Sequence, residues 1–144
     1  MIVIGSDHGG YELKTYIIKY FEENNIEYKD VGCYSEDSVD YPDIAEKLCK
    51  EITGGNAERG ILICGTGIGI SIAANKIKGI RAAVCTDEYC ARMCRHHNNA
   101  NVLCLGGRVV GRELALSITE TYLNGEFEGG RHQNRIDKIH ALEK

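Results

Sequence analysis

Residues 61–75 read ILICGTGIGISIAAN, and this stretch predicts the element on which both the fold and the site depend. Its apolar start is typical of a short buried strand that ends at Cys64. Glycines follow at positions 65, 67 and 69, and the residues around and after them predict a helix over 67–76. A strand, a glycine-rich turn and a helix N-terminus gather backbone N–H groups and the positive end of a helix dipole around one point. We therefore expect a small-molecule site that favours an anion, with a cysteine inside it.

Apolar runs of strand length recur along the chain and alternate with stretches of helical periodicity. We expect strands over 2–5, 27–31, 60–64, 80–85 and 102–105, and helices over 13–21, 42–52, 67–76, 87–96, 111–123 and from 131 onward. Because each strand is mostly apolar and the elements alternate, the sheet should be parallel and covered on both faces. The sequence therefore predicts an α/β protein: a Rossmann-like α/β/α sandwich with a five-stranded parallel sheet, in which residues 1–144 form a single domain.

Two finer expectations concern the helices. Asp40 and Asp87 precede helices and are available to cap them. Leu114, Ile118 and Leu123 should lie on the inner side of the helix over 111–123.

The composition limits the classes of partner. With 144 residues, of which 43% are hydrophobic and 26% charged, the chain has the composition of a folded globular protein. A net charge of −4 gives no support for a nucleic-acid partner, which would favour a basic face. No apolar run approaches the roughly 20 residues that a membrane span needs, so we expect no membrane association. The sequence starts directly with a strand-like run and shows no signal peptide, which predicts a cytoplasmic location.

Seven cysteines stand at positions 33, 49, 64, 85, 90, 94 and 104. An odd number without an export signal argues against a disulfide framework and for a reducing compartment. Cys90, Cys94 and His97 lie near one helical face, but their spacing matches no common metal site. Free cysteine is also a frequent core residue. We expect neither a metal nor another cofactor.

The glycine-rich turn departs from three well-known anion-binding loops. A P-loop needs a lysine that 69–71 lacks, and a Cys-x5-Arg phosphatase loop needs an arginine at Ile70. The dinucleotide fingerprint fits better, because Asp87 ends the next strand about 20 residues further on. Ile70, however, stands where the third glycine would let helix and strand pack closely. Dinucleotide binding therefore stays open as an alternative.

Ligands of parallel sheets bind beyond the carboxyl ends of the strands. Four segments fall there: Asp7-His8, Cys64-Gly65-Thr66, Thr86-Asp87 and Gly106-Gly107-Arg108. His97 comes at the far end of the helix over 87–96, which puts it at the opposite edge of its own sheet. Arg131 and Arg135 lie on the terminal segment and, four residues apart on a helix, can grip one phosphate. A site that needs all of these residues would be completed by another subunit.

Each candidate also has a purely structural interpretation. Cys64 can be one more buried thiol, although the helix N-terminus beside it favours a thiolate. Asp7 can cap a loop, and His97 can end a helix, where the dipole favours histidine. Arg131 and Arg135 can form a solvated basic patch.

Six motifs together are similar to those of one known family. They are GSDHGG (5–10), DYPD (40–43), GILICGTGIGISIAANK (60–76), His97-Asn98, NVL (101–103) and EGGRHQNR (128–135). In combination they resemble the ribose-5-phosphate isomerase B family, which also includes isomerases of allose 6-phosphate and galactose 6-phosphate. The resemblance covers nearly the whole chain.

The resemblance implies a metal-free interconversion of an aldose phosphate and its ketose through a cis-enediolate. Cys64 corresponds to the base that moves a proton between C1 and C2, and this chain lacks the glutamate that other members use in the same loop. Thr66 would assist proton movement between the two oxygens. His97, with Asp7, would open the furanose ring by general acid–base catalysis. The backbone of the loop would hold the developing negative charge, with Gly65, Gly67, Gly69 and Ser71 as binding residues.

The resemblance also implies how the substrate is held and how subunits assemble. His8, Arg108, Arg131 and Arg135 correspond to the phosphate grip, and Asn98 to a contact with a sugar hydroxyl. In the family the site lies at a dimer interface, with His97, Asn98 and Arg108 contributed by the neighbouring subunit. We therefore expect a homodimer or a tetramer of dimers, with the C-terminal helix used in dimerisation.

The substrate expected from these features is a small sugar phosphate, D-ribose 5-phosphate, converted to D-ribulose 5-phosphate. A six-carbon sugar phosphate such as D-allose 6-phosphate is the alternative within the class. A non-catalytic dinucleotide-binding domain is the alternative from another class.

Overall fold

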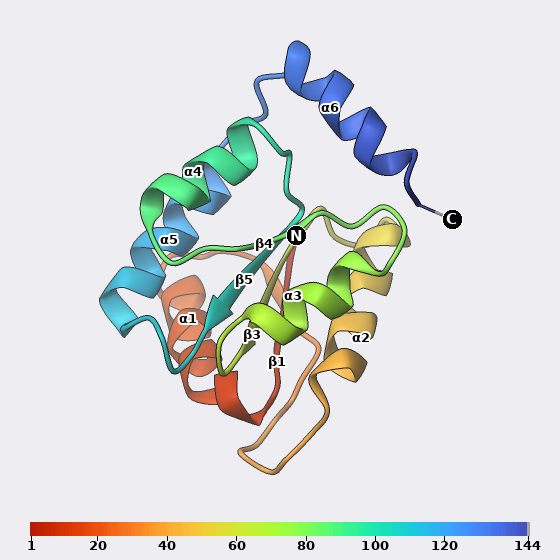
Figure 1. Ribbon diagram of the computed structural model, residues 1–144. Coiled ribbons are helices and arrows are strands. Elements are labelled where there is room, and N and C mark those ends of the chain that lie inside the picture. Colours follow the sequence, from red (N-terminus) through yellow and green to blue (C-terminus); the bar gives the residue numbers. More distant parts are fainter. Residues whose placement is uncertain (144) are drawn as a thin grey trace.

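A single five-stranded parallel sheet forms the centre of the computed structural model, which describes residues 1–143 (Figure 1). Its strands are β1 (Ile2–Ser6), β2 (Tyr28–Asp30), β3 (Arg59–Cys64), β4 (Ala82–Val84) and β5 (Val102–Gly106). They lie in the order β2-β1-β3-β5-β4, and every neighbouring pair is parallel. The predicted Rossmann-like α/β fold is confirmed.

Helices cover both faces of this sheet. The helices within residues 1–143 are α1 (Tyr11–Glu23), α2 (Tyr41–Thr53), α3 (Ile68–Asn75), α4 (Glu88–His96), α5 (Arg112–Asn124) and α6 (Arg131–His140), with a short 3-10 helix, η1 (His8–Gly10), before α1. Figure 1 shows α1, α4 and α5 on one side of the sheet and α2 and α3 on the other. None of the helices within residues 1–143 is long and apolar enough to cross a bilayer.

The two faces are specified by alternation along the strands. Ile61 and Ile63 of β3 belong to the core shared with α1, α4 and α5, whereas Leu62 between them belongs to the core shared with α2 and α3. The same alternation separates Val3 from Ile4 in β1. Successive side chains of a strand point to opposite faces, so continuous apolar runs are needed where both faces are buried.

Three local expectations were wrong. β4 covers only 82–84 rather than 80–85, and before its first residue the Arg81 N–H is bonded to the Asn101 side chain. Asp40 occupies the N-cap position of α2 without a capping hydrogen bond from its side chain, whereas Asp87 caps α4 through the N–H of Cys90 at 2.7 Å. Leu114 is 36% exposed, because α5 turns Ala115 and Ile118 inward instead.

Helix α6 extends beyond the amino edge of the sheet, apart from the two helical layers (Figure 1). His132 and Ile136 are buried along it, but Ile139 is 47% exposed. Leu142, just past its end, is 76% exposed. The terminal segment therefore presents apolar side chains that residues 1–143 leave largely exposed.

At the carboxyl edge, Gly10 allows η1 to lie directly against β3. A Cβ on Gly10 would stand 2.6 Å from the carbonyl carbon of Ile63. Because this neighbour is backbone in the middle of the sheet, it cannot move aside. The loop after β1 is thereby held against the end of β3.

Replacing Gly10 by alanine should lower the free energy of unfolding by about 1–3 kcal/mol or more, since the added methyl group overpacks this contact. Urea unfolding followed by circular dichroism measures the loss. Gly111→Ala is the matched control, because a Cβ at Gly111 meets nothing within 4 Å and the effect at this N-cap should stay below about 1 kcal/mol. Equal stability of the two variants would contradict the tight packing of η1 on β3.

Candidate functional site

Cys64 ends β3 and is almost fully buried, with 5% of its surface exposed. Its sulfur accepts a hydrogen bond from the N–H of Gly67 at 3.1 Å. Gly67 has a left-handed backbone (φ 81°), and a Cβ there would stand 2.9 Å from the carbonyl carbon of Leu105. Only glycine fits this turn, which directs an N–H group and the start of α3 toward the sulfur. The Cys64 sulfur is therefore held at the point where a backbone N–H group and the start of α3 converge.

The hydroxyl groups of the loop have defined partners. Thr66 Oγ1 accepts from the N–H of Ile68 at 3.1 Å, so the Thr66 hydroxyl hydrogen remains available to a ligand. Ser71 donates its own hydroxyl hydrogen to the carbonyl of Ile68 at 2.7 Å, and its N–H is bonded to Gly67 O. The predicted anion cradle is therefore narrower than the whole loop, because the N–H groups of Gly67, Ile68 and Ser71 already have acceptors.

Asp7 and His8 lie beside this loop. Asp7 is 6% exposed and accepts from the N–H of Gly10 at 3.1 Å, so its structural role as a cap is real. His8 Nδ1 accepts from the N–H of Val39 at 3.2 Å, which leaves Nε2 as the protonated nitrogen of the neutral ring. A Cβ on Gly9 would stand 3.2 Å from Gly65 N, which shows how closely the two loops approach.

Arg108 completes the group at the carboxyl edge. Gly107 N–H donates to Cys64 O at 2.8 Å and Arg108 N–H donates to Gly65 O at 3.0 Å, continuing the pairing of β3 with β5. The exposed guanidinium lies over Gly65, with Nη1 3.2 Å from where a Cβ on that residue would be. The expected grouping of Arg108 with His97 and Asn98 is therefore wrong: Arg108 lies beside Cys64 of its own chain, because it follows the strand next to β3.

Tyr41 also borders the loop, although no role was predicted for it from the sequence. A Cβ on Gly69 would stand 2.7 Å from its ring, and the Tyr41 side chain is 38% exposed. Its position after a polar loop gave no signal of this contact, which depends on the packing of α2 against α3.

His97 lies at the opposite, amino edge of the sheet, as expected. It follows α4, and its ring stacks on that of His132 with centroids 4.2 Å apart and planes inclined by 12°. Glu128 approaches both rings, at 3.8 Å from His97 Nε2 and 3.6 Å from His132 Nε2. The exposed Arg131 and Arg135 stand on the same helix as His132. No individual role was predicted for Glu128 or His132 from the sequence, although the two residues are only four positions apart.

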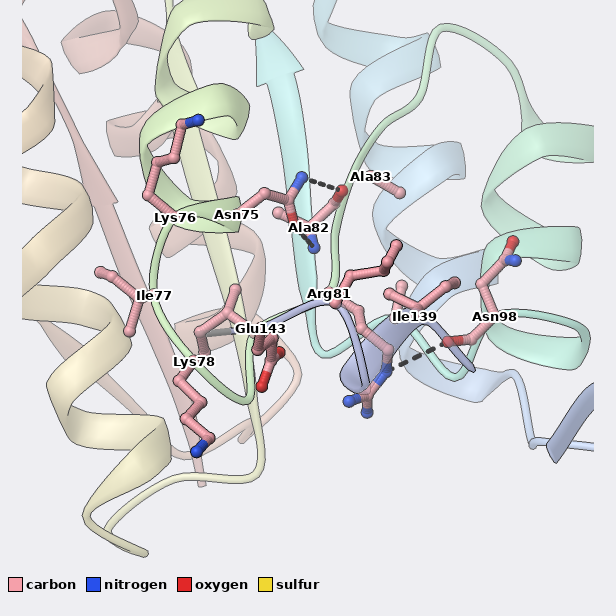
Figure 2. A pocket seen from close by; sticks show the side chains of 13 residues that line it. Asn75, Lys76, Ile77, Lys78, Arg81, Ala82, Ala83, Asn98, Ile139 and Glu143 are labelled. Atoms are coloured by element: carbon pink, nitrogen blue, oxygen red, sulfur yellow. Dashed lines mark hydrogen bonds between the residues drawn. The ribbon is translucent and has the colours of Figure 1, made fainter. Parts of the chain in front are cut away.

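Asn98 borders a cavity of about 770 Å³ at this same edge. Figure 2 shows Lys76, Arg81 and Ile139 around it, with Arg81 bonded to the backbone of Asn98 at 3.2 Å. The cavity lies between the end of α3, the start of β4 and α6, away from Cys64. One chain thus carries the predicted site residues as two groups at opposite edges.

Burial shifts the pKa values of Cys49, Cys104 and His132 from their ordinary values. Burial raises the pKa of the Cys49 thiol to about 12, and raises that of Cys104 well above its ordinary value. Both are therefore neutral core thiols. Burial lowers the pKa of His132, and the neighbouring His97 lowers it further, while Glu128 acts in the opposite direction.

A model of the ribose/galactose isomerase family matches residues 2–139. The chain belongs to the ribose/galactose isomerase family. It is 48% identical over 143 residues to ribose-5-phosphate isomerase B of Escherichia coli, covering 99% of this chain and 96% of that protein. The family resemblance identified from the motifs is confirmed.

Solved structures of ribose/galactose isomerases share the fold. Ribose-5-phosphate isomerase B of Clostridium thermocellum superposes with a TM-score of 0.96 at 55% identity, covering 98% of this chain and 95% of that one. The enzyme of Mycoplasma genitalium, with bound ribulose 5-phosphate, gives a TM-score of 0.92 at 43% identity, covering 97% and 93%.

In this isomerase the titration of His132 is open to direct test. Glu128→Gln should lower the pKa of His132 further, because it removes the carboxylate that stabilises the imidazolium. Imidazole NMR spectra recorded as a function of pH measure the shift. Glu126→Gln, an exposed carboxylate two residues away, should leave the pKa unchanged. A His132 pKa that is equal in wild type and Glu128→Gln would contradict the interaction.

Proposed function

We propose that this chain is an aldose–ketose isomerase that interconverts D-ribose 5-phosphate and D-ribulose 5-phosphate. The observation that carries the proposal is the Cys64 thiol at the mouth of a glycine-rich loop, with Asp7, His8 and Arg108 beside it. The ribulose 5-phosphate bound to the Mycoplasma genitalium relative supports the same substrate.

Cys64 acts as the base. As a thiolate it removes the proton from C2 of the open-chain aldose, and the electron pair forms the cis-enediolate. The same group returns the proton to C1 and yields the ketose. Thr66, whose hydroxyl hydrogen is available, donates to one enediolate oxygen and lets a proton pass between the two oxygens. Backbone N–H groups at Gly65 and Gly69, together with the start of α3, stabilise the charge of the intermediate.

Charged groups hold the phosphate. Arg108 and His8 belong to the same loop cluster as Cys64, and the N–H at His8 Nε2 is a suitable donor. Arg131 and Arg135 are exposed in the first turns of α6 and offer forked donors that match a phosphate. Binding energy from the phosphate then positions C1 and C2 against the base.

The site is completed across a subunit interface in a homodimer, or in a tetramer built from such dimers. Within one chain, Cys64 lies at the carboxyl edge, whereas His97, Arg131 and Arg135 lie at the amino edge. We propose that these amino-edge residues, with Asn98, come from the partner subunit and that His97 opens the sugar ring with Asp7. The exposed Ile139 and Leu142 support α6 and the residues after it as part of the interface.

A six-carbon sugar phosphate such as D-allose 6-phosphate remains the second candidate, because the family also acts on larger sugars. We do not propose dinucleotide binding, because two residues of its fingerprint have other roles. The Asp87 carboxylate that would hold a ribose caps α4 instead, and Ile70 fills the core. We propose a cytoplasmic location. This is supported by the seven cysteines, all of which are free. We also propose that the chemistry uses no cofactor.

Turnover of ribose 5-phosphate and allose 6-phosphate should be compared in EDTA. We expect faster turnover of ribose 5-phosphate, and a kcat about 10²–10⁴-fold lower for Cys64→Ser, because an alcohol cannot act as the base at neutral pH. Cys90→Ser, which changes an exposed cysteine, is the matched control and should turn over normally. Near-normal kcat for Cys64→Ser would remove Cys64 as the base, and turnover of neither sugar would overturn the proposed function.

Subunit complementation tests the shared site. Cys64→Ser and His97→Gln are each expected to be inactive alone. After subunit exchange, each mixed dimer would hold one site with both native residues, so activity should return to about a quarter of the wild-type level. Two Cys64→Ser preparations exchanged in the same way serve as the control. No recovery, with exchange verified by mass spectrometry, would place both residues in sites within one chain.

A further inference from the structure

The cluster of His97, Glu128 and His132 combines three potential metal ligands. Glu128 Oε1 lies 3.8 Å from His97 Nε2 and 3.6 Å from His132 Nε2. One ligand atom from each residue lies within 4.8 Å of those of the other two. Across residues 1–143, no other three histidine, cysteine or acidic side chains converge in this way.

The donor set fits a particular class of cation. Two imidazole nitrogens and one carboxylate oxygen suit Zn²⁺ and related divalent transition metals rather than Mg²⁺ or Ca²⁺. With metal–ligand bonds of about 2.0–2.2 Å, tetrahedral ligands stand roughly 3.4 Å apart. The observed distances to Glu128 of 3.6 and 3.8 Å therefore need to close by only a few tenths of an ångström. A water molecule would take the fourth position.

The backbone holds these ligands in place. Glu128 N–H donates to His96 O at 3.0 Å, which ties the segment before α6 to the end of α4. His132 is 9% exposed, in the first turn of α6. The second oxygen of Glu128 lies 3.4 Å from His96 Nδ1, so an outer group is present to orient the carboxylate.

Two features oppose a cation here. Arg131 and Arg135 add positive charge near His132, but both are exposed, so water and salt screen the repulsion. The nearly parallel stacking of His97 on His132 requires one ring to tilt before both nitrogens face one ion. Both features reduce affinity without removing a ligand.

We propose that His97, Glu128 and His132 bind one divalent transition-metal ion, of which Zn²⁺ is the expected physiological example, and that the bound ion inhibits the enzyme. Inhibition follows because the metal occupies the imidazole nitrogen with which His97 would move a proton. Only the proposed inhibition rests on the proposed function, because metal binding requires no isomerase activity.

Cobalt is a suitable probe because its visible spectrum reports the ligands. Titration of the full chain with Co²⁺, followed by absorption and calorimetry, should give one ion per chain without a thiolate charge-transfer band. Losing one ligand should weaken binding at least about tenfold in both Glu128→Gln and His132→Gln, since even outer groups account for 10–100-fold. His140→Gln and Cys90→Ser should bind normally, and circular dichroism verifies that each variant is folded.

Three results would contradict the proposed metal site. They are the absence of stoichiometric Co²⁺ binding, a thiolate charge-transfer band, and equal Co²⁺ affinity in wild type and Glu128→Gln. For inhibition, saturating Zn²⁺ should reduce wild-type turnover at least about tenfold, because it blocks general acid–base catalysis by His97, and EDTA should restore turnover. Binding that leaves turnover unchanged would overturn the inhibitory half. Absence of turnover in EDTA would count against the isomerase function instead, and the cobalt titration would still decide the site.

Discussion

The structure depends on backbone passing directly against backbone at the carboxyl edge of the sheet. Gly10 lies on the end of β3, and a Cβ on Gly107 would stand 2.7 Å from Gly9 O. A Cβ on Gly106 would stand equally close, at 2.7 Å, to the carbonyl of Thr66. Three loops that belong to β1, β3 and β5 are thereby closed on one another without intervening side chains. This close approach brings Asp7, the Cys64 thiol and the Arg108 guanidinium together.

The parallel topology distributes chemistry between the two edges of the sheet. Loops that follow strands lie at the carboxyl edge, and the ends of helices lie at the amino edge, so His97 cannot reach Cys64 of its own chain. In the proposed homodimer, a symmetric pairing of two chains would bring opposite edges together and create two equivalent sites. In this proposed arrangement α6 would contribute both ligand-binding side chains and exposed apolar surface, which would link assembly with substrate binding.

Much of the fold and part of the site were predictable from local patterns. Strands β1, β3 and β5 were predictable because both of their faces are buried, and the positions of Cys64, Asp7 and Arg108 at the carboxyl edge were predictable because these residues follow strands. The prediction of the inward face of α5 was wrong by one residue. Leu114 and Ala115 are both apolar, and only packing determines which of them is buried. The pairing of Arg108 with Gly65 depends on strand order, and the approach of Glu128 to His97 depends on two segments far apart in the chain.

The helix starts at the carboxyl edge have a consequence for how substrate arrives. The chain carries a net charge of −4, so a sugar phosphate at long range meets weak repulsion. Near the loop, it meets the N-terminal ends of α1 and α3 and the guanidinium of Arg108. At physiological ionic strength, charges act over about 8 Å, so the overall repulsion is screened while the local attraction survives. If substrate binds at the proposed site, capture is therefore a short-range event, and added salt should slow the encounter far less than in an enzyme that draws anions from a distance.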